Sequence, residues 1–300
     1  MLYYQLSKII GNTPLLKWNN LYLKMENYNP SGSIKDRPAG LMLERLVRNG
    51  ILNKGDSFTC ATSGNMGIAL AYFAKEYCLN AIIVMPSNMT NERKKRIKAL
   101  GAKLILTNVK EGMKGSVKKA ESLAKKKGYY YLDQFGSKYN VISHYKTLKE
   151  IVRDLPDVNT IVAGIGTGGT FLGISNMLEI MKLNTKIVGV EPTYANMVYS
   201  YITKTDMTNS FPDKLIPGIG ANFLSPIIKL YLKKDAIVKL VDASKIYNYW
   251  HELLKQGLYV GLSAASSIYV ANQLLEENPY QKIVVIVPDG VDRYLGDSTV

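Results

Sequence analysis

The chain of 300 residues has few cysteines and no long apolar runs. Its two cysteines, Cys60 and Cys78, are too few for a disulfide framework and lack the spacing of metal ligands, so we expect no metal site. No apolar run approaches the roughly 18 residues that a membrane span needs. The first residues show no basic region followed by an apolar core, which is the pattern of a signal peptide. We therefore expect a cytoplasmic protein with neither a membrane partner nor a metal.

Basic residues outnumber acidic ones. Thirty-eight Lys and Arg residues against 24 Asp and Glu residues give a formal net charge of +14. Such a charge makes nucleic-acid binding a hypothesis. The basic clusters at 93–96 and 125–127 fall in helical patterns and lack interleaved aromatic residues, so we interpret both as solvated helix faces and expect no nucleic-acid partner. The charge also suits an anionic substrate and a phosphorylated cofactor.

Short apolar strands alternate with helical patterns along the chain. Alternation at this spacing predicts βαβ units and mostly parallel sheets. We expect an α/β fold of two domains, with the active site between them at the carboxyl ends of the strands. The predicted strands are 21–25, 57–61, 81–86, 103–107, 160–163, 186–190, 236–241 and 283–287. The predicted helices include 92–100, 113–127, 144–155, 243–256 and 263–277. The stretch 191–223 shows no regular pattern.

One lysine stands at an unusual position. Lys35 lies in the stretch 27–38, where Pro30 and Gly32 indicate a loop and a helical pattern begins directly afterwards. At the start of a helix the macrodipole disfavours an ammonium group and helps to lower its pKa. A lysine that loses its proton easily can form a Schiff base. In a chain so rich in lysine, a solvated surface residue is the alternative.

Two turns downstream suit anions. The first, at 62–67, follows a strand and opens a helix, so its backbone N–H groups and hydroxyls could hold a carboxylate, although a plain helix cap explains it equally well. The second, at 164–170, reads Gly-Ile-Gly-Thr-Gly-Gly-Thr. So many glycines close together indicate that the backbone approaches a ligand closely. A phosphate fits there, with two threonine hydroxyls as further donors.

The second turn also matches the dinucleotide fingerprint G-x-G-x-x-G. Glu191 follows at the end of the next strand, about where a ribose-binding acid belongs. An NAD-dependent dehydrogenase is therefore an open alternative, although it gives no role to Lys35 or to the first turn. Pyridoxal 5'-phosphate accounts for all three features, because it needs a lysine for its aldehyde, a cradle for its phosphate and an anion site for the amino-acid carboxylate.

Short motifs stand in a familiar order along almost the whole chain. They are Ile10 to Leu15, Asn29 to Pro38, Thr62 to Gly67, Gln134-Phe135, His144 to Thr147, Gly166 to Thr170, Val188 to Pro192, Gly218 to Gly220 and Arg293 to Leu295. In this order they resemble the cysteine synthase family of fold-type II pyridoxal phosphate enzymes, to which cystathionine β-synthase also belongs. The segment Ser33 to Ala39 looks most like the B-type branch, O-acetylserine sulfhydrylase B.

The resemblance implies a fold and a domain division. The family's tryptophan synthase β-like fold has two intertwined three-layer αβα domains with mostly parallel sheets. Here it implies a smaller, mobile substrate-binding domain at 37–142 and a larger cofactor-binding domain formed by 1–36 and 143–300. It also implies a homodimer.

The resemblance further assigns roles to residues. It implies that Lys35 holds the cofactor as an internal aldimine and, once released, removes the α-proton of the substrate. The other cofactor contacts that it implies are Asn65 at the 3′-oxygen, Gly166, Thr167, Gly168, Gly169 and Thr170 at the phosphate, and Ser263 at the pyridine nitrogen. The substrate contacts that it implies are Thr62, Ser63, Gly64, Met66, Gln134 and Gly218.

The reaction that the resemblance implies is cysteine biosynthesis by β-replacement on an activated serine, O-acetylserine or O-phosphoserine. The leaving group departs to give an α-aminoacrylate, and sulfide or thiosulfate adds at Cβ. Two alternatives stay open within the family. One is a β-elimination or β-replacement lyase on cysteine or serine, cystathionine β-synthase-like and producing hydrogen sulfide. The other is a diaminopropionate-type synthase with an amine nucleophile.

Several positions depart from the family's pattern. Met66 replaces a threonine of the substrate turn and removes one hydroxyl. Cys60 stands where an acid is usual, and we interpret it as a small buried apolar residue. Ala264 and Ala265 follow Ser263 in place of the usual serine and glycine. These departures bear on the substrate and the nucleophile more than on the cofactor.

Overall fold

The computed structural model describes residues 2–62, 64–208, 210 and 215–294. Ser63 and Leu295, named above, lie outside the described residues. The strands are β1 (Leu15–Trp18), β2 (Leu21–Met25), β3 (Ser57–Ala61), β4 (Asn80–Pro86), β5 (Lys103–Thr107), β6 (Tyr130–Tyr131), β7 (Thr160–Gly164), β8 (Lys186–Pro192), β9 (Ile237–Val241) and β10 (Ile283–Val287). The α-helices are α1 (Asp36–Arg48), α2 (Asn65–Ala74), α3 (Asn91–Ala99), α4 (Gly112–Lys127), α5 (Lys138–Ile142), α6 (Tyr145–Asp154), α7 (Gly169–Ile180), α8 (Met197–Thr203), α9 (Pro226–Tyr231), α10 (Ala243–Lys255) and α11 (Leu262–Glu277). Four short 3₁₀ helices join them: η1 (Leu6–Ile9), η2 (Glu26–Tyr28), η3 (Val109–Glu111) and η4 (Val291–Arg293).

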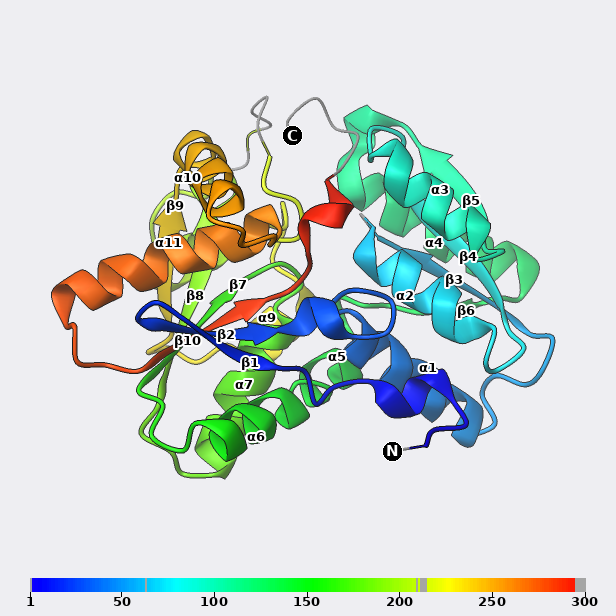
Figure 1. Ribbon diagram of the computed structural model, residues 1–300. Coiled ribbons are helices and arrows are strands. Elements are labelled where there is room, and N and C mark those ends of the chain that lie inside the picture. Colours follow the sequence, from blue (N-terminus) through cyan, green and yellow to red (C-terminus); the bar gives the residue numbers. More distant parts are fainter. Residues whose placement is uncertain (1, 63, 209, 211–214, 295–300) are drawn as a thin grey trace.

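The larger sheet has the strand order β1-β2-β10-β7-β8-β9. All neighbours are parallel except β1, which runs antiparallel to β2. Successive side chains of a strand point to opposite faces, and β10 shows the result: Val285 packs among residues of α10 and α11, whereas Val284 and Ile286 pack among residues of α6 and α7. Helices therefore cover both faces of this sheet (Figure 1).

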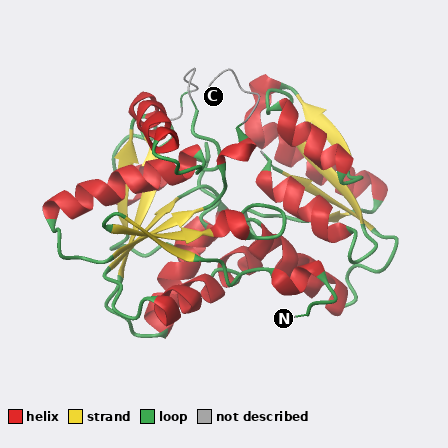
Figure 2. Cartoon of the chain, viewed as in Figure 1, coloured by secondary structure: helices red, strands yellow, loops and turns green. Residues whose placement is uncertain are grey.

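The smaller sheet has the order β5-β4-β3-β6 and is parallel throughout. Phe58 and Cys60 of β3 face the cluster formed by α1, α2 and α3, and the next residue, Ala61, packs on α4. The interpretation of Cys60 as a buried apolar residue is confirmed, since its side chain is fully buried in this cluster. Each sheet thus lies between two layers of helices (Figure 2), and the α/β prediction is confirmed.

The two sheets take their strands from different parts of the chain. Those of the smaller sheet lie within 57–131, and those of the larger sheet come before and after that segment. We therefore propose the division expected from the sequence, with a smaller domain at 37–142 and a larger one from 1–36 and 143–300. Helix α5 contacts both α1 and α7 and so joins the two halves.

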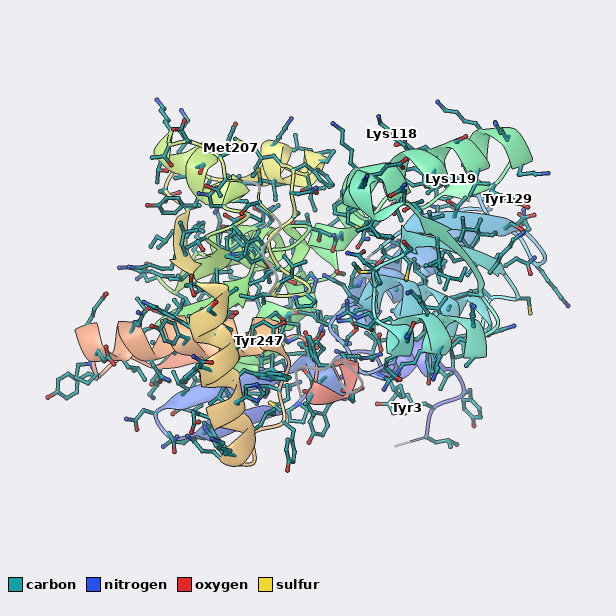
Figure 3. The ribbon with its side chains drawn as sticks, turned by 90° about the horizontal axis from the view of Figure 1, so that it is seen from above. Tyr3, Lys118, Lys119, Tyr129, Met207 and Tyr247 are labelled. Carbon is teal, nitrogen blue, oxygen red and sulfur yellow. The ribbon has the colours of Figure 1, made fainter. Side chains whose placement is uncertain are left out.

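Within the described residues, no helix combines the length and apolar character that crossing a bilayer requires. Lys118 and Lys119 lie on the outer side of α4 (Figure 3), and the cluster at 125–127 is exposed at the end of the same helix. The prediction of a solvated face is wrong for Arg93. Its side chain is only 4% exposed, because it lies against the turn before α2 and 5.9 Å from the ring centroid of Tyr294.

Four charged side chains are buried where β2, α1 and α6 meet. Arg37 pairs with Glu26 through Nε at 2.7 Å and with Glu150 through Nη2 at 2.7 Å. The ammonium of Lys24 lies 2.8 Å from the Glu150 carboxylate. Burial raises the pKa of Glu150, but hydrogen bonds from Arg37 and Lys24 outweigh it and lower that pKa to about 2. The Glu150 carboxylate therefore stays ionised. Together Lys24, Glu26, Arg37 and Glu150 form a buried ion network that fixes the start of α1, two residues beyond Lys35.

Removing Glu150 should destabilise the fold strongly. Glu150→Ala leaves Lys24 and Arg37 buried without that carboxylate, so we expect the free energy of unfolding to fall by about 3–5 kcal/mol. Glu252→Ala is the control, because Glu252 pairs with Lys255 at 2.9 Å on the exposed surface and should contribute less than about 1 kcal/mol. Urea denaturation followed by circular dichroism measures both. Equally small losses in the two variants would contradict a stabilising role for the buried ion network.

Candidate active site

Lys35 is the residue before α1, and its loop is held by the end of β10. The N–H of Ile34 donates to the carbonyl of Pro288 at 2.8 Å. Ser33 forms an antiparallel bridge with Asp289. Since the buried ion network fixes Arg37 on the other side, Lys35 lies between two anchored segments.

The surroundings of Lys35 favour its neutral amine. Burial lowers its pKa to about 8, against the opposing effect of the Asp289 carboxylate, which raises it. The direction agrees with the prediction from the sequence. The cause differs, because desolvation dominates where the sequence suggested the helix macrodipole.

Asn65 begins α2 and faces the same carboxylate. Its Nδ2 donates to Oδ2 of Asp289 at 2.6 Å, and its Oδ1 is buried without a hydrogen-bond partner among the described residues. Nδ2 carries a second hydrogen for a ligand. Sequence reasoning missed Asp289, although its place two residues after β10, at the carboxyl end of a parallel strand, was an available signal. Lys35 and Asn65 thus share a neighbour, because the Asp289 carboxylate acts on the pKa of Lys35 and accepts a hydrogen bond from Asn65.

The predicted substrate turn has its residues close together. Thr62 Oγ1 accepts the N–H of Gly64 at 3.1 Å. The side chain of Gln134 donates from Nε2 to the carbonyl of Ala61 at 2.6 Å, so it lies beside the turn. Met66 is 2% exposed and packs in the core of the smaller sheet, which leaves only its backbone, in the first turn of α2, to face a substrate.

The glycine-rich turn lies between β7 and α7. Gly168, directly before α7, has a φ of +94°, a conformation that favours glycine. A Cβ on Gly166 would collide with the carbonyl oxygen of Gly218, and a Cβ on Gly218 would lie 3.8 Å from Oγ of Ser263. The structure therefore brings together three residues that lie far apart in the sequence. The first N–H groups of α7 have no partners within the helix and suit a phosphate.

The second hydroxyl of this turn meets a buried histidine. Oγ1 of Thr170 lies 3.3 Å from Nε2 of His144, whose other ring nitrogen lies 3.3 Å from Oγ1 of Thr147. Burial, and then the positive charges of Arg37 and Lys35, lower the pKa of His144 well below its usual range. A neutral imidazole therefore supports the glycine-rich turn. The sequence showed His144 as part of a motif but gave it no role.

Glu191 does not serve the dinucleotide alternative. Its carboxylate accepts the backbone N–H groups of Val198 and Tyr199 at 2.9–3.1 Å, and its side chain is 1% exposed. It therefore caps α8 and does not stand as the ribose-binding acid of a dinucleotide site.

Comparisons with known proteins decide the family. Residues 6–289 match the family described as pyridoxal-phosphate dependent enzyme. Cysteine synthase B of Campylobacter jejuni is 37% identical over 97% of this chain and 96% of its own. Cysteine synthase of Buchnera aphidicola is 36% identical, covering 98% of this chain and 94% of its own. The chain belongs to the cysteine synthase family of pyridoxal-phosphate dependent enzymes.

Solved structures related to this cysteine synthase-family enzyme differ in activity. O-ureido-L-serine synthase is 29% identical with a TM-score of 0.89, and covers 100% of this chain and 95% of its own. The O-acetylserine dependent cystathionine beta-synthase from Helicobacter pylori is 30% identical with a TM-score of 0.88, covering 98% of both chains. A hydrogen sulfide-producing enzyme from Fusobacterium nucleatum is 33% identical with a TM-score of 0.88, and covers 98% of this chain and 100% of its own.

The enzyme's residues fit pyridoxal phosphate. Three features would each meet a different part of this cofactor. Lys35, with its lowered pKa, would bond to the aldehyde, and the unused amide hydrogen of Asn65 would be donated to the 3′-oxygen. The glycine-rich start of α7 would bind the phosphate. A side chain at Gly166 would collide with the backbone of Gly218, so only glycine fits at this point of the turn. The cofactor prediction is therefore confirmed by the family, and these residues are the ones that would hold it.

The pKa of Lys35 can be measured in the cofactor-free enzyme. We expect an inflection near pH 8 in ¹³C NMR titration of the reductively dimethylated protein, with the signal assigned by its loss in Lys35→Arg. Asp289→Asn removes a charge that favours the ammonium, so the inflection should move to lower pH. Asp157→Asn, at an exposed surface pair, should leave it in place. An inflection above pH 10 in the parent enzyme would contradict the assignment.

Proposed function

We propose that the enzyme makes cysteine by β-replacement on an activated serine, O-acetylserine or O-phosphoserine, with sulfide or thiosulfate as nucleophile. The observation that carries this proposal is the position of Lys35. Its loop is tied to Asp289, which also accepts a hydrogen bond from Asn65 of the substrate turn. Whole-chain similarity to cysteine synthases supports the same reaction.

Each residue then has a definite task. Bound pyridoxal phosphate supplies an electron sink for the substrate α-carbon. Lys35 takes the α-proton, and a pKa of about 8 lets it act as a base near neutral pH. The turn at 62–66 and Gln134 hold the α-carboxylate, while Asn65 and Ser263 orient the cofactor ring. Closure of the smaller domain, which carries this turn, excludes water.

The related structures define the second candidate. Hydrogen sulfide-producing and cystathionine-forming enzymes share this fold at 30–33% identity. We therefore keep β-elimination or β-replacement on cysteine or serine as the competing reaction, and a diaminopropionate-type synthase beside it. We also propose that the enzyme belongs to the B-type branch and that it is a homodimer. Sedimentation at micromolar concentration tests the homodimer directly.

A substrate screen separates these reactions. O-acetylserine, O-phosphoserine, serine and cysteine are added one at a time to the cofactor-loaded enzyme, followed by sulfide, thiosulfate or an amine, and products are quantified by mass spectrometry. We expect O-acetylserine or O-phosphoserine to be consumed and cysteine or S-sulfocysteine to form. Release of sulfide from cysteine at a higher kcat/KM than either replacement would overturn the proposal in favour of the lyase.

Lys35→Ala provides the internal test of this activity. Loss of a positioned base costs about 10²–10⁴-fold in rate, and we expect kcat/KM to fall by at least that factor. Lys149→Ala, which changes an exposed lysine on α6, should leave kcat/KM unchanged. An active Lys35→Ala variant would refute the assigned base.

A further inference from the structure

Asn140 connects the two anion-binding turns of the site. It lies on α5, is 2% exposed, and its Nδ2 donates to the carbonyl of Gln134 at 2.8 Å and to Oγ1 of Thr167 at 2.9 Å. Gln134 in turn donates to the carbonyl of Ala61, next to the substrate turn. A continuous path of hydrogen bonds thus runs from the end of β3 to the glycine-rich turn.

The orientation of the Asn140 amide follows from its partners. A backbone carbonyl only accepts hydrogen bonds, so the amide nitrogen, rather than the oxygen, must face Gln134. Its Oδ1 lies against Gly169, where it would overlap a Cβ, and has no hydrogen-bond partner among the described residues. Such a buried, half-satisfied amide is costly. It therefore indicates a role that packing alone does not supply.

The hydrogen bonds of Thr167 show what that role is. Oγ1 of Thr167 accepts from Nδ2 of Asn140 and from the N–H of Gly169 at 3.4 Å. A hydroxyl has two acceptor sites and one hydrogen. Because both acceptor sites are used, the hydroxyl hydrogen points elsewhere. Ser225 holds the Thr167 backbone from the other side, donating to its carbonyl at 2.7 Å.

We propose that Asn140 is a positioning residue that turns the Thr167 hydroxyl toward the cofactor phosphate and couples that contact to Gln134 at the substrate carboxylate. Asn140 touches neither ligand itself. The cofactor half of the proposal rests on the family's cofactor, and the substrate half rests on the proposed function.

A double-mutant cycle tests the cofactor half. The dissociation constant of pyridoxal phosphate is measured by fluorescence titration for the parent, Asn140→Ala, Thr167→Val and the double variant. We expect each single change to raise it about 10-fold, and the double variant to bind within about threefold of the weaker single variant, because both remove the same contact. Multiplicative effects in the double variant would overturn the proposal.

Controls keep the outcome decisive. Asn80→Ala removes an exposed asparagine side chain that donates to the Gly55 carbonyl, and cofactor affinity should not change. Circular dichroism and thermal midpoints check that each variant folds. If Asn140→Ala does not fold, Asn140→Leu keeps a similar shape, removes the donor without adding a charge and takes its place in the cycle.

Spectral titration of the cofactor-loaded enzyme with the substrate found in the screen tests the substrate half. Asn140→Ala should raise the apparent dissociation constant at least fivefold, and Asn80→Ala should not. An unchanged constant beside weakened cofactor binding would overturn the link to Gln134. If no activated serine is consumed, the proposed function fails, whereas the cofactor cycle still decides the role of Asn140.

Discussion

The buried ion network is the interaction on which the rest of the site depends. Its two cations and two carboxylates come from β2, η2, α1 and α6, and each side chain is at most 3% exposed. A single buried charge is costly, so each member requires its partners in place. The network therefore permits one arrangement of α1 against the larger sheet. Lys35 stands two residues before Arg37, and its position follows from that arrangement.

A second constraint is the direction of the strands. In a parallel sheet the carboxyl ends lie at one edge, where ligands bind. Strand β3 leads into the substrate turn, β7 into the glycine-rich turn and β10 into Asp289. Asn140, on the helix that joins the two halves, donates to Thr167 of the glycine-rich turn and to Gln134, which in turn donates to Ala61 at the end of β3. The proposed cofactor and substrate sites are thus parts of one connected structure.

Much of the fold was predictable because most of its strands are short apolar runs. The predicted strands 21–25, 57–61, 103–107 and 283–287 have the observed bounds. Strands β1 and β6 were missed because they are short, with four and two residues. Helix α8 falls in the stretch read as irregular. Its first N–H groups are capped by Glu191, a contact that local sequence does not reveal.

The site was predictable only where motifs carry it. The turns and Lys35 have recognisable residue patterns, whereas the environments of Asp289, Arg93 and Asn140 arise from segments distant in sequence.

Peptide mapping after borohydride reduction shows directly which lysine holds the cofactor. The cofactor-loaded enzyme is reduced with borohydride, digested, and mapped by mass spectrometry. We predict the cofactor's mass on the peptide that contains Lys35; the label on any other lysine would contradict the assignment of Lys35.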